Sequence, residues 1–500
     1  MVVDIECGLS NSLPNIVIVG FANKAVGESK ERIRGAFADS RIMLPRKRIT
    51  VNLAPADIPK ADSGFDLAIA VAILQASQQI TLSPNKQQAF IGELGLDGST
   101  RAVRGIIGKI LHGRSMGIVT FFIPWANLQQ ARLVPNVTLV PVESLRQIYE
   151  HLTETVPINP VTTGKSGSEQ KTTTSAPLAE SPLSAVVGQE QAKRALEIAA
   201  AGGHNVFFSG PPGTGKSMLA KALQSILPPL NREETLEVTH LHSLASHDYE
   251  QIITRRPFRS PHHSASHVAI TGGGGSNLRP GEISLAHRGV LFFDELPEFG
   301  RATLEALRQP LEDHVISLAR AKDSIEYPAN FIMVATANPC PCGYYGTGDV
   351  CRCHFHQIRD YRQRISGPIM DRLDLYTDVH EIQHQKLLKQ AVDTAADETT
   401  RQRIVSARQR QAVRFGDPSK LNADMTNSDI KKHAKLTSEA AELLNVASGR
   451  LSLSARSYMR TIKVARTIAD LEAGKRITPA NISEALQYRG QAYKEPQHNY

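Results

Sequence analysis

The sequence contains no long hydrophobic run and no recognisable leader. Its most apolar stretch, Phe65 to Leu74, is interrupted by Asp66 and has about half the length that a bilayer-spanning helix requires. Asp4 and Glu6 lie where the apolar core of a secretory signal peptide would be. These absences argue against a membrane-spanning or exported protein, and they predict a cytoplasmic one without a membrane partner.

Cysteine is also scarce, with five residues in 500, and four of the five lie close together. They form two C-x-C pairs, Cys340 with Cys342 and Cys351 with Cys353. This clustering argues against a disulfide framework and indicates one local site. Four thiolates at this density suit a closed tetrahedral Zn²⁺ site, which would be structural because no ligand position is left for water. The C-x-C spacing is less typical of zinc than C-x-x-C, so free thiols and a redox role remain alternatives.

What the sequence does contain is a complete phosphate-binding loop of the form G-x-x-x-x-G-K-[ST]. The loop consists of Gly210, Pro211, Pro212, Gly213, Thr214, Gly215, Lys216 and Ser217. In this motif the backbone N–H groups turn toward phosphates, the lysine reaches the β- and γ-phosphate oxygens, and the final hydroxyl binds Mg²⁺. Four fixed positions would recur by chance on the order of 0.02 times in a chain of this length. An apolar strand, Asn205 to Ser209, precedes the loop, so the sequence predicts binding of ATP and Mg²⁺.

Two further strand ends carry polar residues that suit hydrolysis. The apolar run Val290 to Phe293 ends in Asp294 and Glu295, which could place one carboxylate near Mg²⁺ and another where it polarises the attacking water. A third apolar strand, Phe331 to Thr336, ends near Asn338, whose amide could orient that water. The plainer alternatives are a solvated acidic strand end and an asparagine that opens a turn. The combination favours ATP hydrolysis.

Composition divides the chain into four parts. Residues 1–152 alternate short strand-like runs with helical patterns, which indicates an α/β domain. Residues 153–183 are rich in Thr, Ser, Pro and Gly and predict a flexible linker that reaches roughly 30 Å. Residues 184–380 carry the nucleotide motifs on alternating strands and helices, the pattern of a parallel sheet. Residues 381–500 have helical spacing throughout and a basic composition.

The charge balance favours an acidic partner. The chain carries 57 Lys and Arg against 49 Asp and Glu, a formal net charge of +8, and nucleic acid is favoured over membrane because no basic amphipathic segment is evident. The glycine run Gly272 to Gly275, flanked by Arg279, predicts a mobile loop. A hairpin over residues 315–327 carries Arg320 and Lys322 around its turn. Both segments are candidates for contact with a phosphate backbone, and solvated loops with incidental charge are the alternative.

The order of these motifs resembles the AAA+ ATPases. The resemblance implies that Asn338 is the first sensor and that Arg372 is the arginine finger inserted into the active site of a neighbouring subunit. Such a finger contributes about 10³–10⁵ in rate, so turnover should require assembly. It also implies that Arg456, at the start of a helix, is the second sensor; an ordinary surface arginine is the alternative. The rival fingers are Arg359, Arg362 and Arg364.

Several longer segments resemble, more specifically, the ComM/YifB family of magnesium-chelatase-like ATPases. They are Arg256 to His263, Arg279 to His287, Asp294 to Phe299, Asn338 to Gly343 and Ser366 to Asp374. The resemblance extends over the whole chain and implies an AAA+ core over 184–380 followed by a helical lid. ComM members act as hexameric branch-migration helicases in natural transformation, which implies a homo-oligomeric ring motor on branched or single-stranded DNA. An ATPase that remodels a protein, as in magnesium chelatase, and a nucleotide-gated DNA-binding scaffold remain alternatives.

The N-terminal part resembles the Lon-protease domain through Pro59 to Asp66 and Gly92 to Gly98. Lon enzymes use a Ser nucleophile activated by a Lys. Alignment of these motifs puts Gly64 at the serine position and Ile107 at the lysine position. Without nucleophile or base we expect no amide hydrolysis. Relative to that domain the chain lacks an initial strand before Val2 to Ile5; either the sequence starts late or the fold lacks this edge strand.

Overall fold

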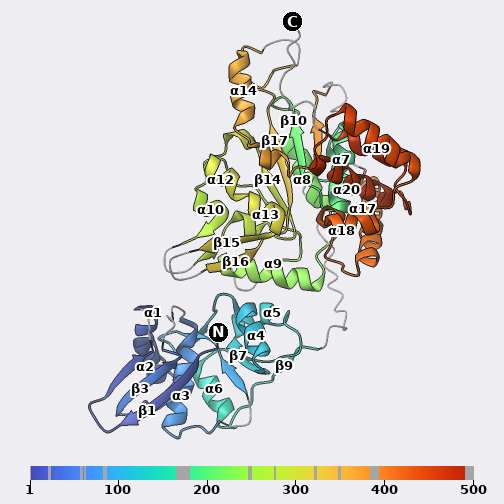
Figure 1. The fold of residues 1–500 in the computed structure, drawn as a ribbon. Helices are drawn as coiled ribbons and strands as arrows, with labels where there is room; N and C mark the ends of the chain where they lie inside the picture. The colour runs from blue at the N-terminus through green and yellow to red at the C-terminus, as the bar shows by residue number, and fades with distance from the viewer. Residues whose placement is uncertain are drawn as a thin grey trace. The chain divides into compact units, whose positions relative to one another are not determined.

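The computed structural model describes most of the chain. The described residues are 2–20, 24–56, 60, 63–82, 87–164, 181–245, 251–274, 278–319, 324–346, 351–382 and 393–489. The N-terminal unit comprises Met1–Thr173, Asn231–Thr254 and Gly274–Arg279, and the P-loop unit comprises Thr174–Leu230, Arg255–Gly273 and Pro280–Tyr500. In the predicted DNA-contacting segments, Gly275 and residues 320–323, which include Arg320 and Lys322, lie outside the described residues. Figure 1 shows the elements of each unit.

The N-terminal unit is built on two principal sheets. The first has the order β1 (Asp4–Ser10), β3 (Arg48–Ala54), β2 (Asn15–Val19), and the second β4 (Gln88–Phe90), β7 (Thr120–Pro124), β8 (Thr138–Val142), β9 (Val161–Thr162). A short pair, β5 (Glu93–Leu94) and β6 (Thr100–Arg101), accompanies α1 (Lys24–Gly27), α2 (Ser29–Asp39), α3 (Asp66–Ala76), α4 (Ile106–Ser115), α5 (Leu128–Ala131) and α6 (Leu145–Leu152). Alternate residues of β3 are buried, which is the period expected when one face of a strand covers a core. The predicted α/β class of this part is confirmed.

The end of the N-terminal unit lies further along the chain than predicted. Strand β9 pairs antiparallel with β8, and the Thr163 hydroxyl donates to the Val137 carbonyl over 3.0 Å. Strand β9 and Thr163 both lie inside the range 153–183 that was predicted as a linker, so paired structure extends at least to Thr163. A two-residue strand has no period to detect, and its pairing partner lies more than twenty residues upstream.

One helix of the N-terminal unit comes from between the two nucleotide motifs. Helix α9 (Arg232–Ala245) packs against α4, and three of its residues at four-residue spacing, Leu236, His240 and Leu244, share one face. A Cβ added at Gly108 of α4 would lie 2.5 Å from His240 Cε1. The predicted uninterrupted domain 184–380 is therefore corrected: Asn231–Thr254 belongs to the N-terminal unit.

The P-loop unit is centred on a five-stranded parallel sheet. Its order is β11 (Phe258–Arg259), β14 (Val290–Phe293), β17 (Ile332–Ala337), β10 (Val206–Ser209), β18 (Leu375–Asp378). Every residue of β14 and β17 is buried, as is typical of strands covered on both faces, and this explains why they read as continuous apolar runs. The neighbouring strands are parallel, so their carboxyl ends meet at one edge of the sheet, where ligands bind in such folds.

Helices and short strands surround this sheet. They are α7 (Glu190–Gly202), α8 (Lys216–Ile226), α10 (His267–Thr271), β12 (Gly272–Gly273), β13 (Arg279–Pro280), α11 (Glu282–Leu285), α12 (Arg301–Ala306), α13 (Arg308–Asp313), β15 (Val315–Ala319), β16 (Ser324–Pro328), α14 (Phe355–Gln363) and α15 (Gly367–Met370). Helices α12 and α13 are separate elements, because Pro310 has no N–H to donate to Ala306. The glycine run is corrected in part: its first two residues form β12 rather than an open loop.

The C-terminal part of the P-loop unit is helical, as predicted. It consists of α17 (Thr394–Phe415), α18 (Asn427–His433), α19 (Ser438–Arg450), α20 (Ala455–Leu471) and α21 (Pro479–Gln487). Asp393, Thr426, Thr437, Ser454 and Thr478 cap the helices by accepting backbone N–H groups. Helices α17 and α20 pack on α7 and share its hydrophobic core (Figure 1). No described helix has the length and hydrophobicity needed to cross a membrane.

Candidate nucleotide and metal sites

The phosphate loop leaves its backbone open on one side. It connects β10 to α8, and Gly213 and Gly215 have φ angles of +79° and +90° in the left-handed region that favours glycine. A Cβ added at either glycine would have no neighbour within 4 Å. At Gly210, by contrast, an added Cβ would lie 2.2 Å from the Val379 carbonyl oxygen. Packing against Val379 therefore requires glycine at position 210. The side of the loop that carries Gly213 and Gly215 is open and leaves room for phosphate to approach.

The Lys216 ammonium is folded back onto the phosphate loop. Its Nζ donates to the carbonyl oxygens of Gly210 and Pro211, each over 2.7 Å, and to Asn338 Oδ1 over 3.2 Å. The side chain is buried, and burial lowers its pKa although the carboxylates of Asp294 and Glu295 oppose that effect. The lysine thus lies at the start of α8 with acceptors that phosphate oxygens can replace.

Asp294 connects the phosphate loop to the neighbouring strand. Its Oδ2 accepts from the Ser217 hydroxyl over 3.1 Å, and its Oδ1 accepts from the Thr336 hydroxyl over 2.7 Å. Thr336 Oγ1 also accepts from the Glu295 backbone N–H over 2.9 Å. Sequence reasoning did not identify Thr336; the available signal was a hydroxyl residue within an otherwise apolar buried strand. A hydroxyl beside a carboxylate supplies the oxygen ligands that Mg²⁺ prefers, so Ser217 and Asp294 fit that ion.

Glu295 and Asn338 lie at the ends of adjacent strands and contact each other. The Asn338 amide donates to Glu295 Oε1 over 3.2 Å. Glu295 has a φ of +53°, a conformation that is uncommon for a residue with a side chain and is often found at functional sites. The structure therefore brings together five residues that the sequence singled out separately: Lys216, Ser217, Asp294, Glu295 and Asn338.

The two predicted arginines meet at a residue that sequence reasoning missed. Arg372 is 9 % exposed, forms a close ion pair with Glu312, and donates to the Pro368 carbonyl over 2.6 Å. Arg456 lies 3.2 Å from the same Glu312 carboxylate. The hydrogen bond from Arg372, aided by the charge of Arg456, holds the pKa of Glu312 below its ordinary value. Arg372 and Arg456 thus share one carboxylate rather than contacting the phosphate loop.

Each rival arginine has a partner nearby. Arg364 pairs with Glu298 over 3.2 Å, and Arg359 lies 3.8 Å from Asp360. Arg362 donates to the Pro339 carbonyl over 3.3 Å, directly after Asn338 in the chain. These contacts do not distinguish the rivals by themselves.

Asn205, a third residue missed from the sequence, supports the Arg372 segment. Its amide donates to the Arg372 carbonyl over 3.0 Å, and its Oδ1 accepts from the Met333 N–H in β17 over 2.8 Å. Asn205 therefore ties the segment before β18 to the sheet. The only signal in the sequence was its position directly before β10.

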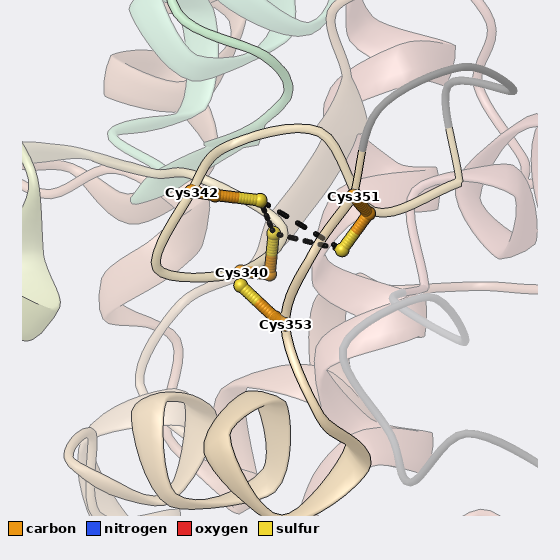
Figure 2. Close-up of side chains that lie close together, drawn as sticks. All are labelled: Cys340, Cys342, Cys351 and Cys353. Atoms are coloured by element: carbon orange, nitrogen blue, oxygen red, sulfur yellow. Dashed lines mark hydrogen bonds between the residues drawn. The ribbon is translucent and has the colours of Figure 1, made fainter.

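The four clustered cysteines converge on one point (Figure 2). Their sulfur atoms all lie within 4.8 Å of one another, and the distances from Cys340 to Cys342 and Cys351 are 3.3 and 3.8 Å. Thiolates around a tetrahedral Zn²⁺, with Zn–S bonds of about 2.3 Å, are separated by about 3.8 Å. All four are free thiols, so the set fits zinc.

The loop that carries these cysteines also touches the phosphate loop. Gly343, with a φ of +91°, approaches Pro212 so closely that an added Cβ would lie 2.7 Å from Pro212 Cδ. The Tyr345 backbone N–H donates to Cys340 Sγ over 3.3 Å. The cysteine loop begins two residues after Asn338 and packs on the phosphate loop at Pro212.

The positions aligned with the Lon dyad are both structural. Gly64 is buried in a short 3₁₀ turn and accepts from the Gly92 N–H, and Ile107 is fully buried in α4. The nearby Lys60 donates to the Pro55 carbonyl, and Lys109 donates to the Arg104 carbonyl over 2.7 Å. Neither aligned position carries a group that could act as nucleophile or base.

Comparison with known proteins agrees with this geometry. Three family profiles match: "Magnesium chelatase, subunit ChlI" over residues 182–387, "Subunit ChlI of Mg-chelatase" over 5–127, and "Magnesium chelatase, subunit ChlI C-terminal" over 394–489. The competence protein ComM of Haemophilus influenzae is 41 % identical over 494 residues, covering 97 % of this chain and 94 % of ComM. The chain belongs to the ComM/YifB family.

Other relatives place this family member among the magnesium-chelatase-like proteins. The uncharacterized protein YifB of Salmonella typhimurium is also 41 % identical over 494 residues, with 97 % of this chain and 94 % of YifB covered. The magnesium-chelatase 38 kDa subunit of Rhodobacter capsulatus is 29 % identical over 187 residues, which cover 32 % of this chain and 50 % of that subunit. Together with the phosphate loop, these matches support an AAA+-type ATPase, for which ATP and Mg²⁺ are implied.

Proposed function

We propose that the chain is an ATP-hydrolysing ring motor that acts on DNA and moves branched junctions. The observation that carries the proposal is the meeting of Lys216, Ser217, Asp294, Glu295 and Asn338 at one sheet edge, with Arg372 held elsewhere by Glu312. The five residues form a nucleotide site within one subunit, and the Arg372 of that subunit does not reach it. In a ring, a neighbouring copy would supply the missing arginine.

The proposed roles follow from the contacts. Lys216 exchanges its carbonyl partners for the β- and γ-phosphate oxygens of ATP, and the open face of the loop supplies backbone N–H donors. Ser217 and Asp294 would hold Mg²⁺, which when bound would neutralise charge on the phosphates. Glu295 accepts the proton of the attacking water while Asn338 fixes the orientation of the carboxylate. Arg372 of the neighbouring copy stabilises the charge that develops on the γ-phosphate.

DNA as the load is supported by the charge of the chain and by its relatives. The net charge of +8 favours a polyanionic partner, and the sequence between β15 and β16 contains Arg320 and Lys322. One relative that matches over nearly its whole length is the competence protein ComM, and the resemblance to its family implies DNA as the load. We therefore propose a homo-oligomeric, hexameric ring that binds single-stranded or branched DNA and serves recombination of incoming DNA.

We also propose that Cys340, Cys342, Cys351 and Cys353 hold a structural Zn²⁺. The sulfur spacing supports it, and so does the use of all four tetrahedral positions by protein ligands. The four thiols would fix the loop that packs on Pro212 and follows Asn338, so the metal site would support the nucleotide site without taking part in hydrolysis.

The decisive experiment compares ATP hydrolysis with and without DNA. The purified protein should hydrolyse ATP faster with forked or single-stranded DNA, and it should move a synthetic four-way junction only when ATP is present. An ATPase rate that is indifferent to DNA would contradict the motor and favour the second candidate, an ATPase that remodels a protein, which the magnesium-chelatase matches support. Junction binding without ATP-dependent movement would instead indicate a nucleotide-gated scaffold.

A further inference from the structure

Glu312 occupies an unusual position between the predicted arginines and the hairpin. It lies in the last turn of α13, three residues before the start of β15, and its side chain is 44 % exposed. Its partners come from two distant segments: Arg372 precedes β18, and Arg456 lies in the first turn of α20. One carboxylate thus holds two cationic side chains from the core and from the helical C-terminal part.

The carboxylate does not saturate these arginines. The Nε of Arg372 is buried without a hydrogen-bond partner among the described residues. A guanidinium is a planar fork that fits phosphate oxygens in pairs, and a phosphate carries more charge than a single carboxylate. Because Glu312 is half exposed, an incoming phosphate can compete with it for Arg372. Binding of Arg372 to a phosphate would therefore release Glu312.

Glu312 is also joined firmly to the hairpin. In α13, Gln309 forms two hydrogen bonds with Ser317 of β15, at 2.9 and 3.2 Å. His314, between the two elements, lies 3.0 Å from Asp424 in the helical C-terminal part. These hydrogen bonds hold helix α13 and strand β15 in a fixed relative position. A change in the partners of Glu312 would therefore also affect the position of β15, the first strand of the hairpin.

We propose that Glu312 is a positioning residue that holds Arg372 and Arg456 together and gives up Arg372 when a neighbouring subunit presents its nucleotide. The release changes the anchorage of α13 and the hairpin β15–β16, so the nucleotide at a subunit interface sets the position of the segment proposed to contact DNA. This inference rests on the proposed function, because it assigns the link between the ATP site and the DNA-contacting hairpin.

The test is Glu312→Gln, which keeps the size of the side chain and removes its charge. Without competition from the carboxylate, Arg372 becomes available and the basal kcat should rise about two- to fivefold, the range expected for loss of a half-exposed ion pair. The ratio of the ATPase rate with single-stranded DNA to the rate without it should fall to near one. The affinity for ATP and the melting temperature should stay close to those of the native protein. Glu312→Asp should restore part of the DNA stimulation.

The matched control is Glu305→Gln, which removes the carboxylate of a partly exposed ion pair between Glu305 of α12 and Arg308 of α13 and should leave every readout unchanged. Normal DNA stimulation in Glu312→Gln would overturn the inference, and so would an equal loss of basal and stimulated rates together with a lower melting temperature. If native protein shows no DNA stimulation, the proposed function fails. The basal kcat of Glu312→Gln then still decides whether the carboxylate restrains Arg372.

Discussion

The Asn338 side chain donates to Glu295 Oε1 over 3.2 Å and at the same time accepts from Lys216 Nζ over 3.2 Å through its Oδ1. One amide therefore connects the residue proposed to bind phosphate with the residue proposed to activate water. Phosphate oxygens that take Lys216 would leave Asn338 with Glu295 as its partner, which ties the orientation of the carboxylate to occupancy of the loop. Neither end of this connection depends on another subunit.

Replacing Glu295 by Gln should abolish hydrolysis and spare binding. The amide cannot accept the proton of the attacking water, so the rate of phosphate release should fall by about 10²–10⁴, the usual contribution of a general base. The Kd for ATP should stay close to that of the native protein, because the Lys216 contacts are not altered. The control is Glu298→Gln, which removes an exposed carboxylate three residues away that pairs with Arg364. A rate within tenfold of the native one would assign the base elsewhere.

The affinity for ATP should weaken as the pH rises. Burial lowers the pKa of Lys216 in the free protein, whereas the charge of bound phosphates raises it. Binding is therefore strongest below the free-protein pKa and is lost progressively as the pH rises through it, by up to tenfold for each unit that separates the free and bound values. Isothermal titration with a non-hydrolysable ATP analogue at alkaline pH measures this. Lys216→Arg should bind with little pH dependence, because arginine keeps its charge.

The apolar strands and the phosphate loop could be predicted because their signals are local. Val290 to Phe293 was predicted with the bounds that β14 has, since a strand buried on both faces must be a continuous apolar run. The functional role predicted for Asp294 followed from its place directly after this strand. The strand β9 could not be found, because two residues carry no period and its pairing with β8 is long-range.

The missed residues owe their importance to tertiary contacts. Glu312 and Arg456 are separated by 144 positions, and no local pattern connects them. Thr336 is notable only because folding places its hydroxyl between Asp294 and the Glu295 N–H. In the same way, the assignment of α9 to the N-terminal unit follows from packing against α4 and could not be recognised from the helical pattern of its sequence.

Subunit mixing tests whether Arg372 acts on a neighbour. Arg372→Ala should lose about 10³–10⁵ in ATP turnover, and Lys216→Ala should also be inactive because it cannot hold phosphate. A mixture of the two should regain part of the activity, since an intact loop from one chain can meet an intact Arg372 from the other. Arg364→Ala serves as the control and should keep most of the native rate. If mixtures stay inactive while mixed oligomers form, Arg372 does not act across the interface.

The cysteine cluster should contain one zinc ion per chain. Metal analysis of the purified protein should find about one equivalent of Zn²⁺, and Cys342→Ser should lose it and lower the melting temperature. ATP hydrolysis should fall as well, because the loop that packs on Pro212 and follows Asn338 would be less ordered. Cys7→Ser is the matched control, since Cys7 lies in β1 outside the cluster and should leave the zinc content unchanged. Native protein without metal, or full zinc in Cys342→Ser, contradicts the site.

Two glycine-to-alanine changes within helices should have opposite effects on stability. Alanine is favoured over glycine in a helix by about 0.5–1 kcal/mol, and Gly449 in α19 has no neighbour within 4 Å of an added Cβ, so Gly449→Ala should stabilise the protein by that amount. At Gly108 the same methyl group would lie 2.5 Å from His240 Cε1, and His240 is held between α9 and α4.

Gly108→Ala should therefore destabilise the N-terminal unit by about 1–3 kcal/mol despite the gain in helix propensity, as overpacking does elsewhere. Chemical denaturation of both variants measures the difference. Shortening the opposing side chain in the double variant Gly108→Ala with His240→Ala should recover part of the loss, because the added methyl group then has room. Equal stabilisation by both alanines would mean that α9 does not pack against α4, and the segment Asn231–Thr254 would then belong with the P-loop unit instead.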